Sequence, residues 1–177
     1  MSKIILYQGD YLQICSIDTW EFVERPNCTG IVNIIAVTDN EELLLIEQYR
    51  AGLDNVVIEL PAGLAGDHAE FKNESLEKAA KRELLEETGY EAQRLKQLIS
   101  TPPSCGMSSE IITFFYSDKI KKIGCGGGID SEDICVYPVP IKEIASFLAD
   151  QQRQNKAIAT QVYAGLYLLS LERNTSI

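Results

Sequence analysis

The pattern of apolar and polar positions changes period several times along the chain, and each change predicts an element. Residues 3–25 hold short alternating runs separated by Asp10 and Asp18, which favour turns, so we expect an antiparallel β meander. The run from Ile31 to Thr38 is almost entirely apolar, as is typical of a strand covered on both faces. Further strands are predicted at residues 43–48, 56–60, 92–100, 110–117 and 134–139.

Helical periodicity predicts the remaining elements. The first helix is expected to run from Asn73 or Glu74 to Thr88, with Asn73 as its N-cap and Gly89 as its C-terminal stop. Two more helices are predicted at residues 141–148 and 156–171. Strands, then a helix, then further strands and helices indicate a single α+β domain of packed layers over residues 1–177.

Charge and cysteine content narrow the choice of partner. The formal net charge of −10 argues against nucleic acid or an anionic membrane surface. A small phosphate compound stays compatible, because a bound divalent cation changes the local sign of the charge. The five cysteines form no C-x-x-C pair and are odd in number, which indicates reduced thiols in a cytoplasmic protein. No segment approaches the roughly 20 apolar residues of a membrane span, and the first residues lack the apolar run of a signal peptide.

The first predicted helix carries its carboxylates on an unusual side. At about 100° per residue, Glu83, Glu86 and Glu87 fall within roughly a third of the helix circumference. The apolar residues that project to the same side are Leu76, Ala79, Ala80 and Leu84. A solvated acidic face would lie opposite the apolar stripe. Carboxylates on a buried face need a counter-charge, which a hard divalent cation supplies, and the alternative is a charged helix without chemistry.

A longer motif surrounds these glutamates. Glu74 is followed by seven residues and then by Arg82-Glu83-Leu84-x-Glu86-Glu87-x-Gly89-Tyr90. This run resembles the Nudix box, G-x5-E-x7-R-E-U-x-E-E-x-G-U, in which U is a bulky apolar residue. Gly63 resembles the first glycine of the box, although ten residues separate it from Glu74 where the box has five. Residues 63–90 are therefore expected to form a Nudix box with a lengthened loop, and the resemblance implies an α/β/α sandwich with a mixed sheet.

The same resemblance implies a metal site. Glu83 and Glu87 would ligate the cation, Glu86 would join directly or through water, and the Ala62 carbonyl oxygen would complete the site. Oxygen ligands with retained waters suit Mg²⁺, with Mn²⁺ as the alternative. Arg82 is expected to support catalysis by holding a box glutamate in place rather than by meeting substrate.

Segments outside the box resemble one branch of this family, the ADP-ribose pyrophosphatases. In that branch the N-terminal strands, here residues 1–30, help to form a homodimer, and an aromatic ring from this region stacks on adenine. Trp20 is the matching candidate, with ordinary packing in a strand as its alternative. The matching segments are Thr19-Trp20-Glu21-x-Val23-x-Arg25, Gln48-Tyr49-Arg50, Glu59-Leu60-Pro61-Ala62-Gly63 and Ser104-Cys105-Gly106-Met107-Ser108-Ser109-Glu110.

The resemblance also gives charged residues a role in binding substrate. Glu21 and Arg25 would assist at the base and diphosphate. Arg50 would contact the diphosphate or ribose, because a planar guanidinium grips phosphate oxygens. Each of these residues could instead form a surface ion pair. Glu110 is a weaker candidate for the metal or substrate shell, and His68 is expected to be a solvated loop residue.

A catalytic base is expected from the loop before the last strand. In the ADP-ribose branch this loop supplies a base from outside the box, and Glu132 aligns best with it, as base or as an extra metal ligand. Asp130 is the alternative, and Asp133 is the third choice. The glycine run at residues 124–128 could let this loop close over substrate or could be an idle connector.

The resemblance therefore predicts a Mg²⁺-dependent hydrolase that cuts ADP-ribose to AMP and ribose 5-phosphate. One alternative is GDP-mannose or another nucleoside diphosphate sugar, cleaved by the same machinery. An alternative of another class is a Nudix module that senses a nucleotide without cleaving it, against which the complete set of box carboxylates argues. A calcium-binding helix-loop-helix protein is disfavoured, because residues 63–74 lack the ordered run of loop acids that such a site needs.

Overall fold

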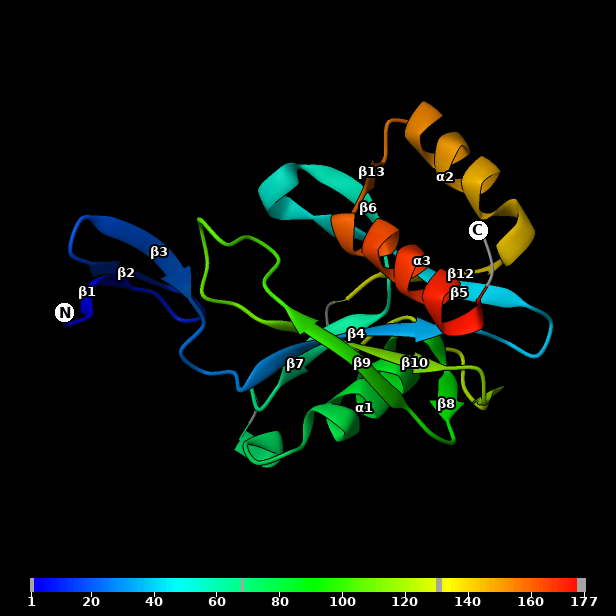
Figure 1. The fold of residues 1–177 in the computed structure, drawn as a ribbon, viewed down its shortest axis with the longest axis horizontal. Helices are drawn as coiled ribbons and strands as arrows, with labels where there is room; N and C mark the ends of the chain where they lie inside the picture. Colours follow the sequence, from blue (N-terminus) through cyan, green and yellow to red (C-terminus); the bar gives the residue numbers. More distant parts are fainter. Residues whose placement is uncertain (1, 68, 130–131, 175–177) are drawn as a thin grey trace.

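The computed structural model describes residues 2–67, 69–129 and 132–174, and its N-terminal strands form a sheet of their own. Strands β1 (Ile4–Gln8), β2 (Gln13–Ile17) and β3 (Trp20–Glu24) pair antiparallel in the order β1-β2-β3. This sheet projects away from the remainder of the molecule (Figure 1). The predicted N-terminal meander is confirmed.

The centre of the molecule contains two four-stranded sheets with mixed pairing. The first has the order β7-β4-β10-β9, in which β10 runs parallel to β4 and the other pairs are antiparallel. Its strands are β4 (Gly30–Ala36), β7 (Ala62–Ala65), β9 (Lys96–Thr101) and β10 (Ile112–Ser117). The second has the order β12-β5-β6-β13, in which only β13 runs parallel to its neighbour among these described strands. Its strands are β5 (Glu42–Arg50), β6 (Asn55–Glu59), β12 (Ile134–Pro140) and β13 (Ala157–Ile158).

Short elements connect these sheets. A two-stranded ladder joins β8 (Tyr90–Ala92) to β11 (Ile120–Lys122). Single 3₁₀ turns occur at η1 (Ala51–Leu53), η2 (Ala69–Phe71) and η3 (Ile141–Glu143). The ladder divides the strand predicted at residues 92–100, because Ala92 pairs with Ile120 whereas β9 begins at Lys96 and pairs with β10.

Helices cover both sides of the sheets. Helix α1 (Leu76–Thr88) lies on one side, and α2 (Ile144–Arg153) and α3 (Thr160–Arg173) lie on the other (Figure 1). The central strand β4 explains the apolar run of the sequence, because Val32 and Ile34 join the buried cluster of Leu84 on α1. Ile35 joins the cluster of Val162 on α3. Burial of each such side chain contributes about 1.5–3 kcal/mol. The predicted α/β/α sandwich with a mixed sheet is confirmed.

The start of α1 differs from the prediction. The N-cap is Ser75, whose Oγ accepts a hydrogen bond from the Lys78 N–H at 3.3 Å, and not Asn73. The reason is tertiary, because Glu74 is drawn out of the helix into an ion pair with Arg82. The predicted stop is confirmed: Gly89 adopts φ 75° and its N–H donates to the Leu85 carbonyl at 2.9 Å.

The last helix begins later than residue 156. Asn155 has a φ of 63°, and the following pair Ala157–Ile158 forms β13 beside β6. Helix α3 therefore starts only at Thr160. Periodicity alone did not show this, because Ile158 fits a helical stripe as well as a short strand. No helix in the described parts of the chain is long and apolar enough to cross a membrane.

Candidate active site

Strand β7 brings the backbone of residues 62 and 63 directly against the carboxylates of α1. The Ala62 N–H donates to Glu87 Oε2 at 3.0 Å. Gly63 faces Glu83 so closely that an added Cβ would overlap its carboxyl group. A glycine is therefore required here for space, not for backbone conformation. The two glutamates that the sequence analysis named as metal ligands point toward this strand.

Arg82 connects the glutamates of the predicted box. Its Nη1 donates to Glu83 Oε1 at 2.8 Å and to Glu86 Oε2 at 3.0 Å. Its Nη2 donates to Glu74 Oε1 at 2.8 Å and to the Leu64 carbonyl at 3.1 Å. Arg82 thus contacts the glutamates that the family resemblance expects it to hold. Glu74 was quoted in the motif without a role, and its partner could be found only from the fold of the lengthened loop.

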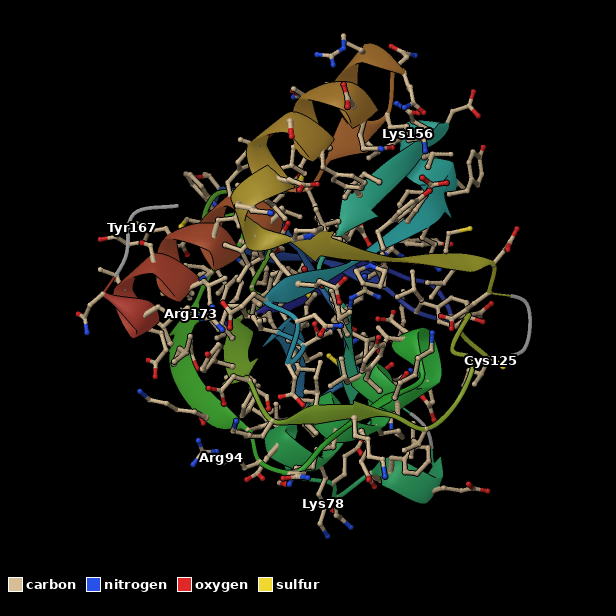
Figure 2. All side chains as sticks on the ribbon, turned by 90° about the vertical axis from the view of Figure 1, so that its right-hand side faces the viewer. Lys78, Arg94, Cys125, Lys156, Tyr167 and Arg173 are labelled. Atoms are coloured by element: carbon tan, nitrogen blue, oxygen red, sulfur yellow. The ribbon has the colours of Figure 1, made fainter. Side chains whose placement is uncertain are left out.

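The lysines of α1 lie away from this carboxylate face. Lys78 points outward from the helix (Figure 2), and Lys81 pairs with Glu77 at 2.8 Å on the outer side. Neither lysine therefore neutralises the glutamates that face β7. The helical projection places Lys78, Lys81 and Arg82 away from the glutamates, and it is wrong for Arg82, whose long side chain reaches back to Glu83 and Glu86.

Burial perturbs the two inner carboxylates. Glu87 is only 4% exposed, and burial raises its pKa well above the ordinary 4.5, although the Ala62 N–H opposes this shift. Burial likewise raises the pKa of Glu83 to about 7, against the opposing charge of Arg82. Burial thus disfavours the ionised form of both inner carboxylates, and a bound cation would oppose that effect.

The residues present fit such a cation. The donors at β7 and α1 are oxygens, namely carboxylates and the backbone carbonyl of Ala62, and these are the ligands that Mg²⁺ prefers. Among the described residues, no three acidic, cysteine or histidine side chains already converge on one point. Arg82 Nη1 contacts both Glu83 and Glu86, so these two carboxylates already share one cationic partner within the chain. Water and substrate phosphates commonly complete a Mg²⁺ site of this kind.

The predicted base Glu132 lies within electrostatic reach of this site. Its charge contributes to the raised pKa of Glu87 and to that of Arg50. It is exposed, and its Oε2 accepts a hydrogen bond from the Ile129 N–H at 3.1 Å. Asp133 is exposed as well. The alternative base Asp130 lies outside the described residues, as does His68.

The glycine run before Glu132 is attached to the end of α1. The Gly127 N–H donates to the Glu87 carbonyl at 2.8 Å, and the Gly128 N–H donates to the Glu86 carbonyl at 3.1 Å. Positive φ values from Gly126 to Gly128 allow this path. The run satisfies carbonyls that a helix end leaves unpaired. It is thus a cap for the helix, a role that neither interpretation of the sequence included.

Arg50 and Glu59 form an ion pair on neighbouring strands. Arg50 Nε donates to Glu59 Oε1 at 3.1 Å, and Nη2 pairs with Oε2. Arg50 was predicted to bind substrate, whereas Glu59 was not singled out. The hairpin register places both side chains on one face but four positions apart, so hairpin spacing alone does not predict the pair.

The remaining substrate-binding candidates lie on or beside the N-terminal sheet. Trp20 is 60% exposed and Glu21 is exposed, both on β3, which lies well apart from α1 (Figure 1). Arg25 Nε donates to Glu110 Oε1 at 2.6 Å, a pairing across 85 positions that sequence reasoning missed. Within this chain, the structure does not bring Trp20 or Glu21 to the carboxylate face.

Comparison with known protein families identifies the family to which the chain belongs. The NUDIX domain family matches residues 29–160, which is well over half of its length. The chain belongs to the NUDIX family. The relationship agrees with the carboxylate helix and with the glycine that faces it.

Relatives within the family carry several functional names. A methanol dehydrogenase activator of Bacillus methanolicus is 35% identical over 113 residues, 64% of this chain and 57% of that protein. An ADP-ribose pyrophosphatase of Bacillus subtilis is 35% identical over 100 residues, 56% of this chain and 50% of that protein. A GDP-mannose pyrophosphatase of Klebsiella pneumoniae is 31% identical over 153 residues, 81% of this chain and 73% of that protein. The matches therefore span between half and three-quarters of these relatives.

A solved structure supports the fold. A crystal structure of an ADP compounds hydrolase superposes with a TM-score of 0.67 at 18% identity, covering 84% of this chain and 81% of that one. At this identity the likeness concerns the arrangement of the elements alone. The overall arrangement of helices and sheets is thus shared.

Proposed function

We propose that this NUDIX chain hydrolyses the diphosphate bond of a nucleoside diphosphate sugar in the presence of Mg²⁺, with Mn²⁺ as the alternative cation. The observation that carries the proposal is the pair Glu83 and Glu87, which point toward β7 from a buried helix face and have raised pKa values. The relatives named for ADP-ribose and GDP-mannose support a nucleoside diphosphate substrate.

Glu83 and Glu87, together with the Ala62 carbonyl oxygen, would hold the cation, and Glu86 would join directly or through water. When bound, the cation would supply positive charge against the diphosphate, whose anionic oxygens otherwise repel the nucleophile. Arg82 would keep the carboxylates in register from behind.

Glu132 is the proposed general base. A water molecule attacks one phosphorus, its proton passes to the Glu132 carboxylate, and the bond between the bridging oxygen and that phosphorus breaks. The other phosphate leaves with the bridging oxygen. Glu132 is suited to this because it is exposed to solvent and close enough to Glu87 to raise its pKa.

ADP-ribose is the preferred substrate in this proposal, giving AMP and ribose 5-phosphate. The support is the similarity to the Bacillus subtilis ADP-ribose pyrophosphatase and the residues Trp20, Arg25 and Arg50 of that branch. GDP-mannose is the second candidate, because similarity to GDP-mannose pyrophosphatases extends over 81% of the chain. Trp20 would stack on either purine.

We further propose that the N-terminal sheet forms a homodimer interface. Large apolar side chains are exposed on β1 to β3 and their turns, which is unusual for a surface that stays in water. They are Ile4, Ile5, Leu6, Tyr7, Tyr11, Leu12, Ile14 and Trp20. A second copy of the chain would cover them and could bring Trp20 near a substrate.

The five free cysteines support the expected reducing, cytoplasmic compartment.

Phosphate release in a coupled phosphatase assay tests the proposed reaction. The panel contains ADP-ribose, GDP-mannose, NADH, diadenosine polyphosphates and nucleoside triphosphates, each with and without Mg²⁺. Mg²⁺-dependent cleavage that is fastest with ADP-ribose is expected. A maximum at GDP-mannose would keep the reaction and change the substrate. No cleavage of any compound, with nucleotide binding retained in Glu83→Gln and Glu87→Gln, would favour a sensor.

A further inference from the structure

The β5–β6 hairpin holds a charged pair whose acidic member has no assigned role. Glu59 lies on β6 opposite Ile46, and Arg50 lies near the end of β5 opposite Asn55. Because side chains alternate along a strand, Ile46 and Arg50 share one face, and Glu59 shares it with them. Arg50 must therefore reach back along the sheet to meet Glu59.

The direction of this reach is toward the carboxylate site. Glu59 stands three residues before Ala62, whose N–H binds Glu87. The charge of Glu59 also contributes to the raised pKa of Glu87, which places it close to that group. The Arg50 guanidinium is thus drawn away from the turn at residues 51–54 and toward the end of the NUDIX helix.

The two residues differ in burial, as expected if Glu59 positions the Arg50 guanidinium and Arg50 contacts substrate. The Glu59 side chain is 15% exposed, whereas the Arg50 side chain is 45% exposed. Glu59 contacts the Nε and Nη2 atoms of Arg50. A guanidinium has five N–H groups, so, within the described residues, three of them on Nη1 and Nη2 are not used by Glu59. The Nη1–Nη2 edge has the fork geometry that binds phosphate oxygens in pairs.

We propose that Glu59 is a positioning residue that fixes the guanidinium of Arg50 and turns its Nη1–Nη2 edge toward the diphosphate of the substrate. The inference rests on the proposed function, because Arg50 is the diphosphate contact in that proposal. Without Glu59, the Arg50 side chain would sample several orientations. Ordering it on binding would then cost free energy and lower the affinity for substrate. Glu59 itself touches neither substrate nor cation.

Steady-state kinetics of Glu59→Gln test the positioning role. The substitution keeps the shape of the side chain and removes its charge. KM is expected to rise by about tenfold to a hundredfold, as the loss of one oriented, charge-assisted contact does, while kcat changes less. Glu77→Gln is the matched control, because Glu77 also pairs with a cation but on the outer side of α1. An unchanged KM in Glu59→Gln would overturn the inference.

A double-substitution cycle separates positioning from general stability. In an Arg50→Gln background, Glu59→Gln is expected to change KM by less than about twofold, because the residue through which Glu59 acts is gone. Independent, additive losses of the two substitutions would contradict the proposal. Mn²⁺ affinity, measured by titration calorimetry, is expected to stay within about twofold in Glu59→Gln. A large loss of that affinity would make Glu59 a metal ligand instead.

A binding measurement decides the inference even if no compound of the panel is cleaved. The probe is inorganic pyrophosphate with Mg²⁺, observed through the ¹⁵Nε resonance of Arg50. Saturating probe is expected to shift this resonance in the wild type, and Glu59→Gln is expected to weaken pyrophosphate binding by about tenfold or more. Failure of turnover alone would therefore remove the proposed function. No Arg50 shift in the wild type, or equal binding in both proteins, would remove the positioning role.

Discussion

The carboxylate face of α1 and the N-terminal sheet differ in how complete each is within one chain. Glu87 is buried against β7 of the same chain and receives the Ala62 N–H, whereas Trp20 is 60% exposed on a sheet that projects from the body. In the proposed function, a cation bound between α1 and β7 completes the first region. In the same proposal, a second copy of the chain covers the exposed apolar side chains of the N-terminal sheet. We therefore expect bond cleavage to depend on contacts inside the chain, and base recognition to depend on a second copy.

The largest expected effect comes from replacing Glu87, the most buried carboxylate on the carboxylate face of α1. Glu87→Gln should lower kcat by about 10³-fold, because it removes a proposed ligand of the cation. The metal-free variant should be at least as stable as the wild type, since a buried charge is lost. Turnover and thermal unfolding measure the two effects. A kcat within tenfold of the wild type would contradict the assignment, and Glu77→Gln serves as the control.

A methyl group at residue 63 should displace the Glu83 carboxyl group, a proposed metal ligand, while Glu83 itself is retained. Gly63→Ala places a Cβ where the Glu83 carboxyl group now lies, so we expect Mn²⁺ affinity and kcat to fall by about 10²-fold. Gly52→Ala is the matched control, because a Cβ there meets no atom within 4 Å. Equal behaviour of the two variants would show that Glu83 need not sit where the structure places it.

Loss of the proposed base should separate chemistry from cation binding. Glu132→Gln is expected to lower kcat by about 10²-fold while Mn²⁺ affinity is retained. Turnover and calorimetric titration of the same preparation provide both values. A rate near that of the wild type would move the base to Asp130 or Glu110. A parallel loss of Mn²⁺ affinity would instead make Glu132 a metal ligand.

The smallest expected effect comes from a substitution in the N-terminal sheet. Trp20→Ala should raise KM about tenfold and change kcat less, because stacking on a base contributes to binding in the ground and transition states alike. The Trp20→Ala variant should also dimerise more weakly than the wild type, which sedimentation at several protein concentrations measures. A change in kcat with a constant KM would indicate that Trp20 supports the fold and does not read the base.

Local features of the sequence predicted the helix and the face that carries its glutamates, because both depend on residues a few positions apart. The side of α1 that carries Glu83 and Glu87 follows from helical geometry, and Gly89 ends the helix as expected. Contacts between distant segments were not predictable in the same way. The pair Arg25 and Glu110 is joined by the docking of the N-terminal sheet.

Two further differences have the same origin. Ser75 replaces Asn73 as N-cap because Glu74 is occupied by Arg82, a contact that depends on the path of the lengthened loop. The glycine run caps α1 because β12 returns beside β5 and brings the run to the helix end. Composition suggested flexibility for this run, whereas its hydrogen-bond partners lie about forty residues earlier in the chain.

Thermal unfolding of the metal-free protein between pH 5 and 8, with and without Mg²⁺, tests the buried carboxylate site most directly. In the folded protein the pKa of Glu83 is about 7, against an ordinary 4.5, so between these values the folded state holds more protons than the unfolded state. Stability should therefore fall as pH rises from 5 to 7, by about 2 kcal/mol from this group. Mg²⁺ should restore it at pH 8, and the paired substitution Glu83→Gln, Glu87→Gln should abolish both effects. A metal-free unfolding temperature that is flat from pH 5 to 8 and indifferent to Mg²⁺ would contradict a cation site on this face of α1.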